Sequence, residues 1–166
     1  MVDNFDNLDQ MGVSASNLRN IMNSNFPQYK SEEIVVTFDG GTTNGIGDES
    51  GTDNPHTMFT VTGVIELSII AVCTTSLVGD SATLEIGTAL STANLIAQTT
   101  ATDIDEKDIW HDASPDSSIE LTSVITRKLV SQDIILTVGT ADITAGVIKF
   151  IVRWAPISSD GNLVAA

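Results

Sequence analysis

Apolar residues recur at every second position over most of the chain from residue 33 onward, and this period of two restricts the fold more than any other sequence feature. Successive side chains of a β-strand point to opposite faces, so an alternating segment predicts a strand that buries one face. Thr, Ile and Val, whose branched side chains favour strands, number 20, 18 and 14 among 166 residues. The alternation is clearest in four series: Ile34 to Phe38, Phe59 to Cys73, Ile134 to Val138 and Ile148 to Trp154.

Seven or eight short strands separated by Gly, Asp and Ser clusters predict an all-β fold, an antiparallel β-sandwich or jelly roll. Gly63 interrupts the long alternating stretch from Phe59 to Cys73. We expect this stretch to be a bent strand that passes from one sheet to the other. Shorter strands are expected at 84–86 and 95–97, and another should run from Ile119 toward Val130. The two last series, 134–138 and 148–154, predict a hairpin with a wide loop.

Residues 1–31 have few β-branched residues and are predicted to form a separate N-terminal arm, leaving 32–166 as the sandwich domain. Ser14 or Ser16 can cap a short helix that Pro27 would end. Its apolar positions are Leu18, Ile21, Met22 and Phe26. Two interpretations stay open: a loosely attached leader, or an arm whose apolar residues bind a neighbouring subunit.

The charge and the single cysteine exclude several classes of protein. Seven basic and 22 acidic residues give a formal charge of −15, which disfavours nucleic acid and anionic membranes as partners. Cys73 has no second cysteine to pair with, so the fold must be held by its core or by assembly. The acidic N-terminus predicts no secretory signal, and no apolar stretch is long enough to span a bilayer.

One sequence motif resembles part of an enzyme active site. Gly79-Asp80-Ser81 together with Asp108-x-x-His111 is similar to two blocks of the GDSL-type esterases. Those enzymes place the serine in an α/β domain and need oxyanion donors from further Gly and Asn blocks, which are not evident here. We therefore expect no enzymatic activity and no cofactor.

The segment from Asp103 to Glu120 is rich in carboxylates, which are the ligands that Ca²⁺ prefers. Asp103, Asp105 and Asp108 are the calcium candidates, although the spacing does not match an EF-hand. The alternatives are a solvated acidic loop, which is the default, or ion pairs between subunits. His56 and His111 have no spacing typical of zinc ligands and are interpreted as loop residues.

Trp110 lies within this acidic segment and has two interpretations. It can be an exposed aromatic residue that stacks on a sugar or a protein partner, or it can close one end of the sandwich core, which we favour. Trp154 follows the inward alternation of its strand and is predicted to lie in the core, as is Cys73.

The chain from residue 56 to residue 164 resembles a family of short structural proteins of tailed bacteriophages and prophages. Five segments carry the resemblance: 56–63 (HTMFTVTG), 97–105 (AQTTATDID), 109–116 (IWHDASPD), 139–146 (GTADITAG) and 156–162 (PISSDGN). The first 31 residues lie outside it.

The resemblance implies a virion component, with a head decoration or cement protein expected. Its partners would then be the major capsid protein and further copies of itself, in a homo-oligomer that we expect to be a trimer. It would be made in the host cytoplasm and lie on the outer surface of the capsid. The alternative is a neck, tail or head-fibre component, including a glycan-binding module that uses exposed loop aromatics.

Overall fold

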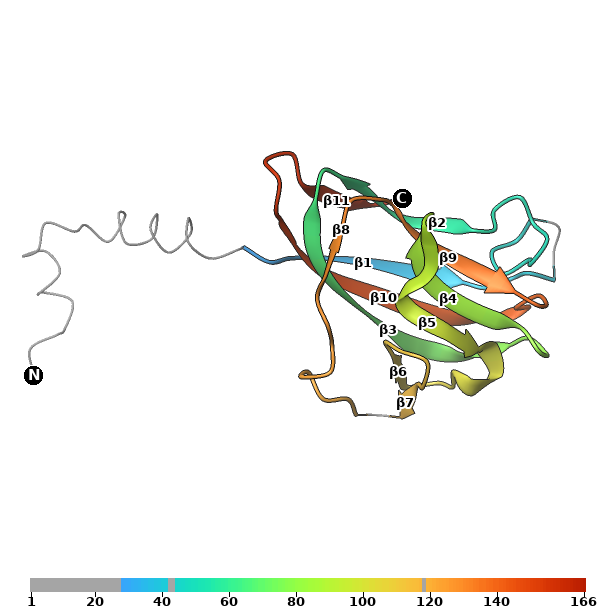
Figure 1. Ribbon diagram of the computed structural model, residues 1–166. Coiled ribbons are helices and arrows are strands. Elements are labelled where there is room, and N and C mark those ends of the chain that lie inside the picture. The colour runs from blue at the N-terminus through green and yellow to red at the C-terminus, as the bar shows by residue number, and fades with distance from the viewer. Residues whose placement is uncertain (1–27, 42–43, 118) are drawn as a thin grey trace, which may run out of the picture.

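The computed structural model describes residues 28–41, 44–117 and 119–166, and this part of the chain forms two antiparallel β-sheets packed face to face (Figure 1). The all-β sandwich predicted from the sequence is confirmed. The strands are β1 (Lys30–Thr37), β2 (His56–Thr62), β3 (Ile65–Val78), β4 (Thr83–Thr88), β5 (Ser91–Thr100), β6 (Asp108–Trp110), β7 (Asp116–Ser117), β8 (Lys128–Val130), β9 (Ile134–Gly139), β10 (Ala145–Pro156) and β11 (Asn162–Ala165), and a 3₁₀ turn η1 (Ala101–Asp103) follows β5.

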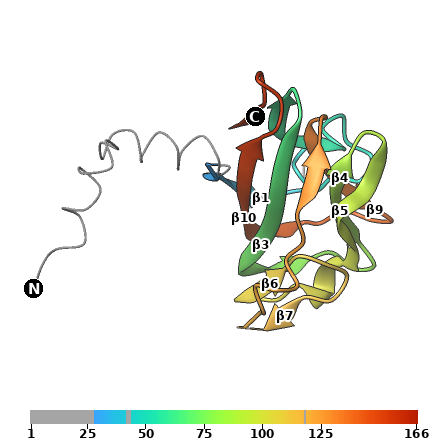
Figure 2. The ribbon, with the colours of Figure 1, turned by 60° about the vertical axis from the view of Figure 1, so that its left-hand side comes forward.

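The order of the strands is that of a jelly roll. Sheet A has the order β1-β10-β3-β6-β7, with β8 also paired to β3, and sheet B has the order β11-β2-β9-β4-β5. Without the short strands β7, β8 and β11, sheet A contains the first, eighth, third and sixth strands, and sheet B the second, seventh, fourth and fifth. This is the double Greek-key order of a jelly roll. Figure 2 shows β1, β10 and β3 on one side and β4, β5 and β9 on the other.

The core lies between the two sheets and consists of the inward residues that the alternation predicts. Trp154 lies opposite Leu67, and Phe150 lies opposite Ala71, where β10 pairs with β3. All four side chains are buried, and Cys73 is buried two residues beyond Ala71, as predicted. Each large apolar side chain buried in this way contributes about 1.5–3 kcal/mol to folding.

Gly63 is the point at which the chain crosses from sheet B to sheet A. β2 ends at Thr62 in sheet B and β3 begins at Ile65 in sheet A, so the predicted bent strand is present as two strands. Gly63 has φ +63°, a left-handed conformation that non-glycine residues rarely adopt. The Val64 N–H donates to Ser158 Oγ at 2.8 Å, which satisfies the backbone at the crossing.

Two predictions about the strands are wrong. β9 and β10 do not form a hairpin, because β9 pairs with β2 and β4 in sheet B and β10 pairs with β1 and β3 in sheet A. Alternation alone does not distinguish a hairpin from a connection between sheets. The strand expected from Ile119 to Val130 is reduced to β8, and Ile119 and Leu121 are exposed.

The boundary of the predicted arm also moves. Lys30 and Ser31 already belong to β1, where they pair with Trp154 and Arg153. The predicted helix and its apolar residues Leu18, Ile21, Met22 and Phe26 lie outside the described residues.

Candidate functional site

The outer face of sheet A has a mixed basic and apolar character that contrasts with the acidic composition of the chain. Three strands run across it in register, so its side chains form rows: Ser31–Arg153–Ser68, Glu33–Ile151–Ile70 and Val35–Lys149–Val72. The central column, on β10, places an isoleucine between two cations. Lys149 Nζ makes an ion pair with Glu33 Oε2 at 2.6 Å, whereas Arg153 has no ion pair with any residue that the structure describes.

A groove follows these rows, and we call it the outer groove. It has a volume of about 380 Å³. β3 and β10 form its floor, and the loop before β8 forms one wall. A smaller hollow of about 80 Å³ shares three of its residues and extends it to Tyr29. The lining of the groove and its extension is Ser68, Ile70, Thr122, Ile125, Arg127, Ile151 and Arg153, with Tyr29 at the end.

A hydrogen-bonded cluster of Tyr29, Glu66 and Arg127 lies at that end of the groove. The Tyr29 hydroxyl donates to Glu66 Oε1 at 2.9 Å, and Arg127 Nη1 donates to the Tyr29 hydroxyl at 2.7 Å and to Glu66 Oε1 at 3.2 Å. The guanidinium also lies 5.0 Å from the centre of the Tyr29 ring, which is within cation–π range. The hydrogen bond to Glu66 is the main cause of a raised pKa of Tyr29. This cluster joins the start of β1 to the loop before β8.

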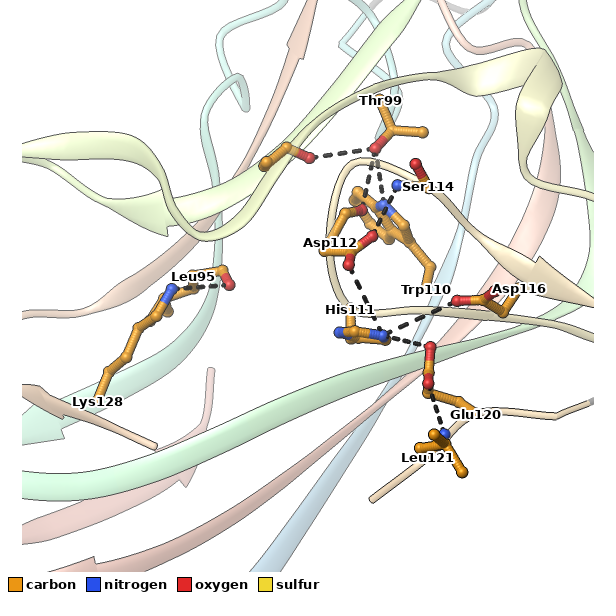
Figure 3. Close-up of polar contacts among 11 residues, drawn as sticks. Leu95, Thr99, Trp110, His111, Asp112, Ser114, Asp116, Glu120, Leu121 and Lys128 are labelled. Atoms are coloured by element: carbon orange, nitrogen blue, oxygen red, sulfur yellow. Dashed lines mark hydrogen bonds and ion pairs between the residues drawn. The ribbon is translucent and has the colours of Figure 1, made fainter. Parts of the chain in front are cut away.

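A second polar cluster surrounds His111 at the β6–β7 end of the sandwich (Figure 3). Its imidazole Nε2 lies 2.6 Å from Glu120 Oε2, 3.9 Å from Asp112 Oδ2 and 4.0 Å from Asp116 Oδ2. Only 7% of the His111 side chain is exposed, so its contact with Glu120 is shielded from water. The Leu121 N–H also donates to Glu120 Oε1, at 2.5 Å.

The crowding of carboxylates in this cluster shifts the pKa values of two acidic side chains in opposite directions. A hydrogen bond shared with Glu120 raises the pKa of Asp116, and the same hydrogen bond, followed by the one with His111, lowers the pKa of Glu120 to about 2. A proton held between the two carboxyls therefore offsets their repulsion. His111, Asp116 and Glu120 each offer one ligand atom, and these three atoms lie within 4.8 Å of one another. A divalent cation bound there can also offset the repulsion between the carboxylates.

These two clusters hold both ends of a segment that exposes large apolar side chains. We call residues 119–129 the exposed segment. Glu120 fixes its start and Arg127 fixes its end, while Lys128 Nζ donates to the backbone oxygens of Asn94 and Leu95. Its exposed apolar residues are Ile119 (76%), Leu121 (66%), Val124 (44%) and Leu129 (68%). Four exposed apolar side chains within eleven residues make this segment a candidate surface for contact with another protein.

The calcium candidates are not brought together. Asp103 and Asp105 are exposed, whereas Asp108 is buried and its Oδ2 accepts the Asp105 N–H at 2.9 Å. The Asp108 carboxylate is therefore occupied in stabilising its own turn. Among the residues that the structure describes, the group with a geometry suited to a metal ion is His111, Asp116 and Glu120, and it contains none of the three calcium candidates.

Trp110 is fully buried, so its interpretation as an exposed partner-binding residue is wrong and its interpretation as a core residue is confirmed. Its indole Nε1–H donates to Thr99 Oγ1 at 2.9 Å, and its ring packs edge-on against Phe150 with centroids 6.2 Å apart. Ser81, the serine of the esterase-like motif, lies in the turn between β3 and β4 with φ +61°. No hydrogen bond joins it to His111 or Asp108 in the described part of the chain.

The sequence reasoning missed the outer groove, although a signal was present. Ile70, Val72 and Ile151 occupy positions that the alternation assigns to the outer, polar face. Apolar residues out of phase with the core are the sign of a second apolar surface.

No protein-family model, curated protein or solved structure matches this chain. No helix among the described residues is long and apolar enough to cross a membrane.

Proposed function

We propose that the chain is a non-enzymatic structural protein of a tailed-bacteriophage virion, a decoration protein that binds the major capsid protein on the outer head shell across capsomer boundaries. The observation that carries the proposal is the exposed segment. Four large apolar side chains face solvent between Ile119 and Leu129, on a backbone that side-chain contacts hold at both ends, His111–Glu120 at one and Arg127–Glu66 at the other. A segment held in this way loses little conformational entropy when a partner covers it.

The chemistry of the surface supports a protein partner rather than DNA or lipid. A net charge of −15 repels phosphate backbones and anionic headgroups, which suits a position on the outside of a DNA-filled shell. Each copy needs only a modest contact, because the symmetry of a shell repeats it many times. The mechanism is then the sum of many small interface energies that oppose the internal pressure of the packaged DNA.

Two further observations support this assignment. Residues 56–164 resemble phage structural proteins, and the jelly-roll order is one that viral capsid proteins also use. The alternative glycan-binding role relied on an exposed Trp110, and that side chain is buried. A neck, tail or head-fibre position is the alternative that the first experiment below distinguishes.

The first experiment measures the copy number of the chain in purified virions by quantitative mass spectrometry, relative to the major capsid protein. A ratio near one to one, or one per local threefold axis, is the result expected for a shell protein. A ratio below about one tenth contradicts the decoration role and indicates a neck, tail or fibre component, since these are present in few copies. Absence from the particle contradicts any virion role.

The second experiment tests the exposed segment directly. The double variant Leu121→Ser/Val124→Ser should bind purified shells at least about tenfold more weakly, because two lost apolar contacts cost about 1–2 kcal/mol or more. The matched control is Val78→Ser/Val164→Ser, which removes two exposed apolar side chains elsewhere on the surface. Equal binding by both double variants would exclude the exposed segment as the contact.

A further inference from the structure

The outer groove ends at Tyr29, and the 27 residues before Gln28 are attached at that end. We propose that the outer groove is a binding site for the N-terminal segment, residues 1–27, of a second copy of this chain, so that neighbouring copies exchange these segments. This goes beyond binding to the shell, because it names the surface through which the copies join one another.

The groove offers a peptide two kinds of contact. Ile70 and Ile151 on the floor and Ile125 on the wall provide an apolar track along the sheet. Arg127 and Arg153 stand beside that track, and Arg153 makes no ion pair with any other described residue. A ligand that matches the groove is therefore an apolar peptide with negative charge nearby.

Residues 1–27 have this chemistry. Leu18, Ile21, Met22 and Phe26 supply large apolar side chains at spacings that place them on one side of a short helix. Asp3, Asp6 and Asp9 against the single Arg19 give the stretch a net charge of 3 × (−1) + 1 = −2. A segment so short, with so few apolar residues, is marginal alone and gains its stability from a surface on which it docks.

The position of Tyr29 favours a segment from another copy. The Tyr29 hydroxyl and ring contact Glu66 and Arg127, so the chain's own residue closes the near end of the groove. To enter its own groove, the N-terminal segment would have to reverse direction at Pro27 and Gln28 and pass back over Tyr29. A neighbour's segment can enter from the far end, beside Ile70 and Ile151. Such head-to-tail exchange closes into a ring when the rotation between copies returns to the first copy, and a trimer is one such ring.

Cysteine cross-linking in the full-length chain tests the proposal. The double variant Ile21→Cys/Ile151→Cys places one thiol in the N-terminal segment and one on the floor of the groove. The native Cys73 does not compete, because it is buried and burial raises its pKa to about 11. The control pair is Ile21→Cys/Thr60→Cys, with the second thiol on the exposed side of β2 in sheet B.

Under mild oxidation we expect covalent dimers and larger species on a non-reducing gel from the groove pair, and at most a small fraction of these from the control pair. A cross-linked band that migrates as a single chain would show that the segment folds onto its own groove and would overturn the exchange. Equal cross-linking by both pairs, or none by either, would overturn the groove as the binding site.

The oligomeric state provides a second readout. Ile151→Asp puts a carboxylate in the groove and should shift the full-length chain from oligomer to monomer in light scattering, while its circular dichroism spectrum stays that of a β-sandwich. Val164→Asp on β11 is the control and should leave the oligomer intact. A wild-type chain that is monomeric at about 0.1 mM would contradict the proposal, since exchange weaker than this has a free energy below about 5.5 kcal/mol. Neither experiment contains capsid protein, so a failure here is distinct from a failure of the proposed function.

Discussion

Single buried polar groups determine how the acidic end of the molecule is held together. Trp110 and Trp154 are both fully enclosed, but among the described residues only the Trp110 indole N–H has a hydrogen-bond partner, the Thr99 hydroxyl. The Thr99 hydroxyl also lies 3.2 Å and 3.3 Å from the backbone oxygens of Ala97 and Asp112. It therefore links β5 to the chain that leads out of β6, beside the His111 cluster (Figure 3).

Replacing the Thr99 hydroxyl should measure how much this link contributes to the free energy of unfolding. Thr99→Val keeps the shape of the side chain but leaves the Trp110 N–H buried without an acceptor, so we expect a loss of about 1–3 kcal/mol in the free energy of unfolding. Thr99→Ser keeps the hydroxyl and is the control, with a smaller loss from the missing methyl group. Urea denaturation of the three proteins gives the comparison, and equal losses would show that the hydrogen bond contributes nothing.

The His111 cluster predicts a pH-dependent effect. The lowered pKa of Glu120 contributes stability above its ordinary value of 4.5, and that contribution is lost as the pH falls toward about 2. The raised pKa of Asp116 acts in the opposite sense, because above that pKa its charge repels Glu120 and reduces stability.

Asp116→Asn should therefore raise the melting temperature at pH 7, and this gain should shrink as the pH is lowered toward 3, where the wild-type Asp116 is itself protonated. Thermal unfolding across this pH range checks it. Asp103→Asn, an exposed residue outside the cluster, corrects for the loss of one negative charge. A gain that is the same at every pH would rule out ionisation of Asp116 as the cause.

At the scale of strands and turns, the period of two predicted which residues face the core but not which strands pair. β2, β3, β4, β5, β9 and β10 all lie where alternation placed them. Pairing depends on where the connections lead, and the 140–144 connection crosses between sheets without a sequence signal that separates it from a hairpin loop. The groove was missed for the same reason, since it joins segments far apart in the sequence. The His111 cluster lies within residues 111–120, but the spacing of the acidic segment does not show which of its carboxylates turn toward the imidazole.

Gly63 is an exception, because the sequence did indicate that the chain bends at this residue and passes from one sheet to the other. A Cβ at this position would lie 2.4 Å from Ser158 Oγ and 2.5 Å from Asp160 Oδ1, and φ is +63°. Gly63→Ala should destabilise the fold by about 1–3 kcal/mol, from backbone strain and displacement of these two side chains. Gly41→Ala is the control, because the nearest described atoms to its new Cβ would be Thr144 Cγ2 at 3.5 Å and Thr144 Cβ at 3.8 Å, which are ordinary contacts. Similar denaturation midpoints for the two variants would contradict the assigned role of Gly63.

At the scale of the whole molecule, the sandwich and the N-terminal segment are expected to have separate roles. Among the described residues, the first fully buried core residue is Val36, in the second half of β1. Lys30 and Ser31 pair with β10, so a deletion that tests the arm should stop before Gln28 rather than at residue 31.

Deleting residues 1–27 should leave a folded sandwich with an unchanged far-ultraviolet spectrum and a melting temperature within a few degrees of the full-length chain, since only surface contacts are lost. The same protein should no longer form oligomers, and it should bind shells more weakly because each copy then binds alone. Sedimentation with purified shells measures the binding, and full occupancy by the shortened chain would contradict the role of the arm.

The jelly-roll strand order also determines when, during synthesis, the fold can be completed. Among the described residues β1 pairs only with β10, which is synthesised after every other strand except β11. At a translation rate of about 5–20 residues per second, β1 waits of the order of ten seconds for its partner. The groove floor needs β3 and β10 together, so it does not exist before β10 has been synthesised. Exchange between copies can then begin only between chains that have completed β10, which keeps neighbouring polypeptides on one messenger from joining before their sandwiches have folded.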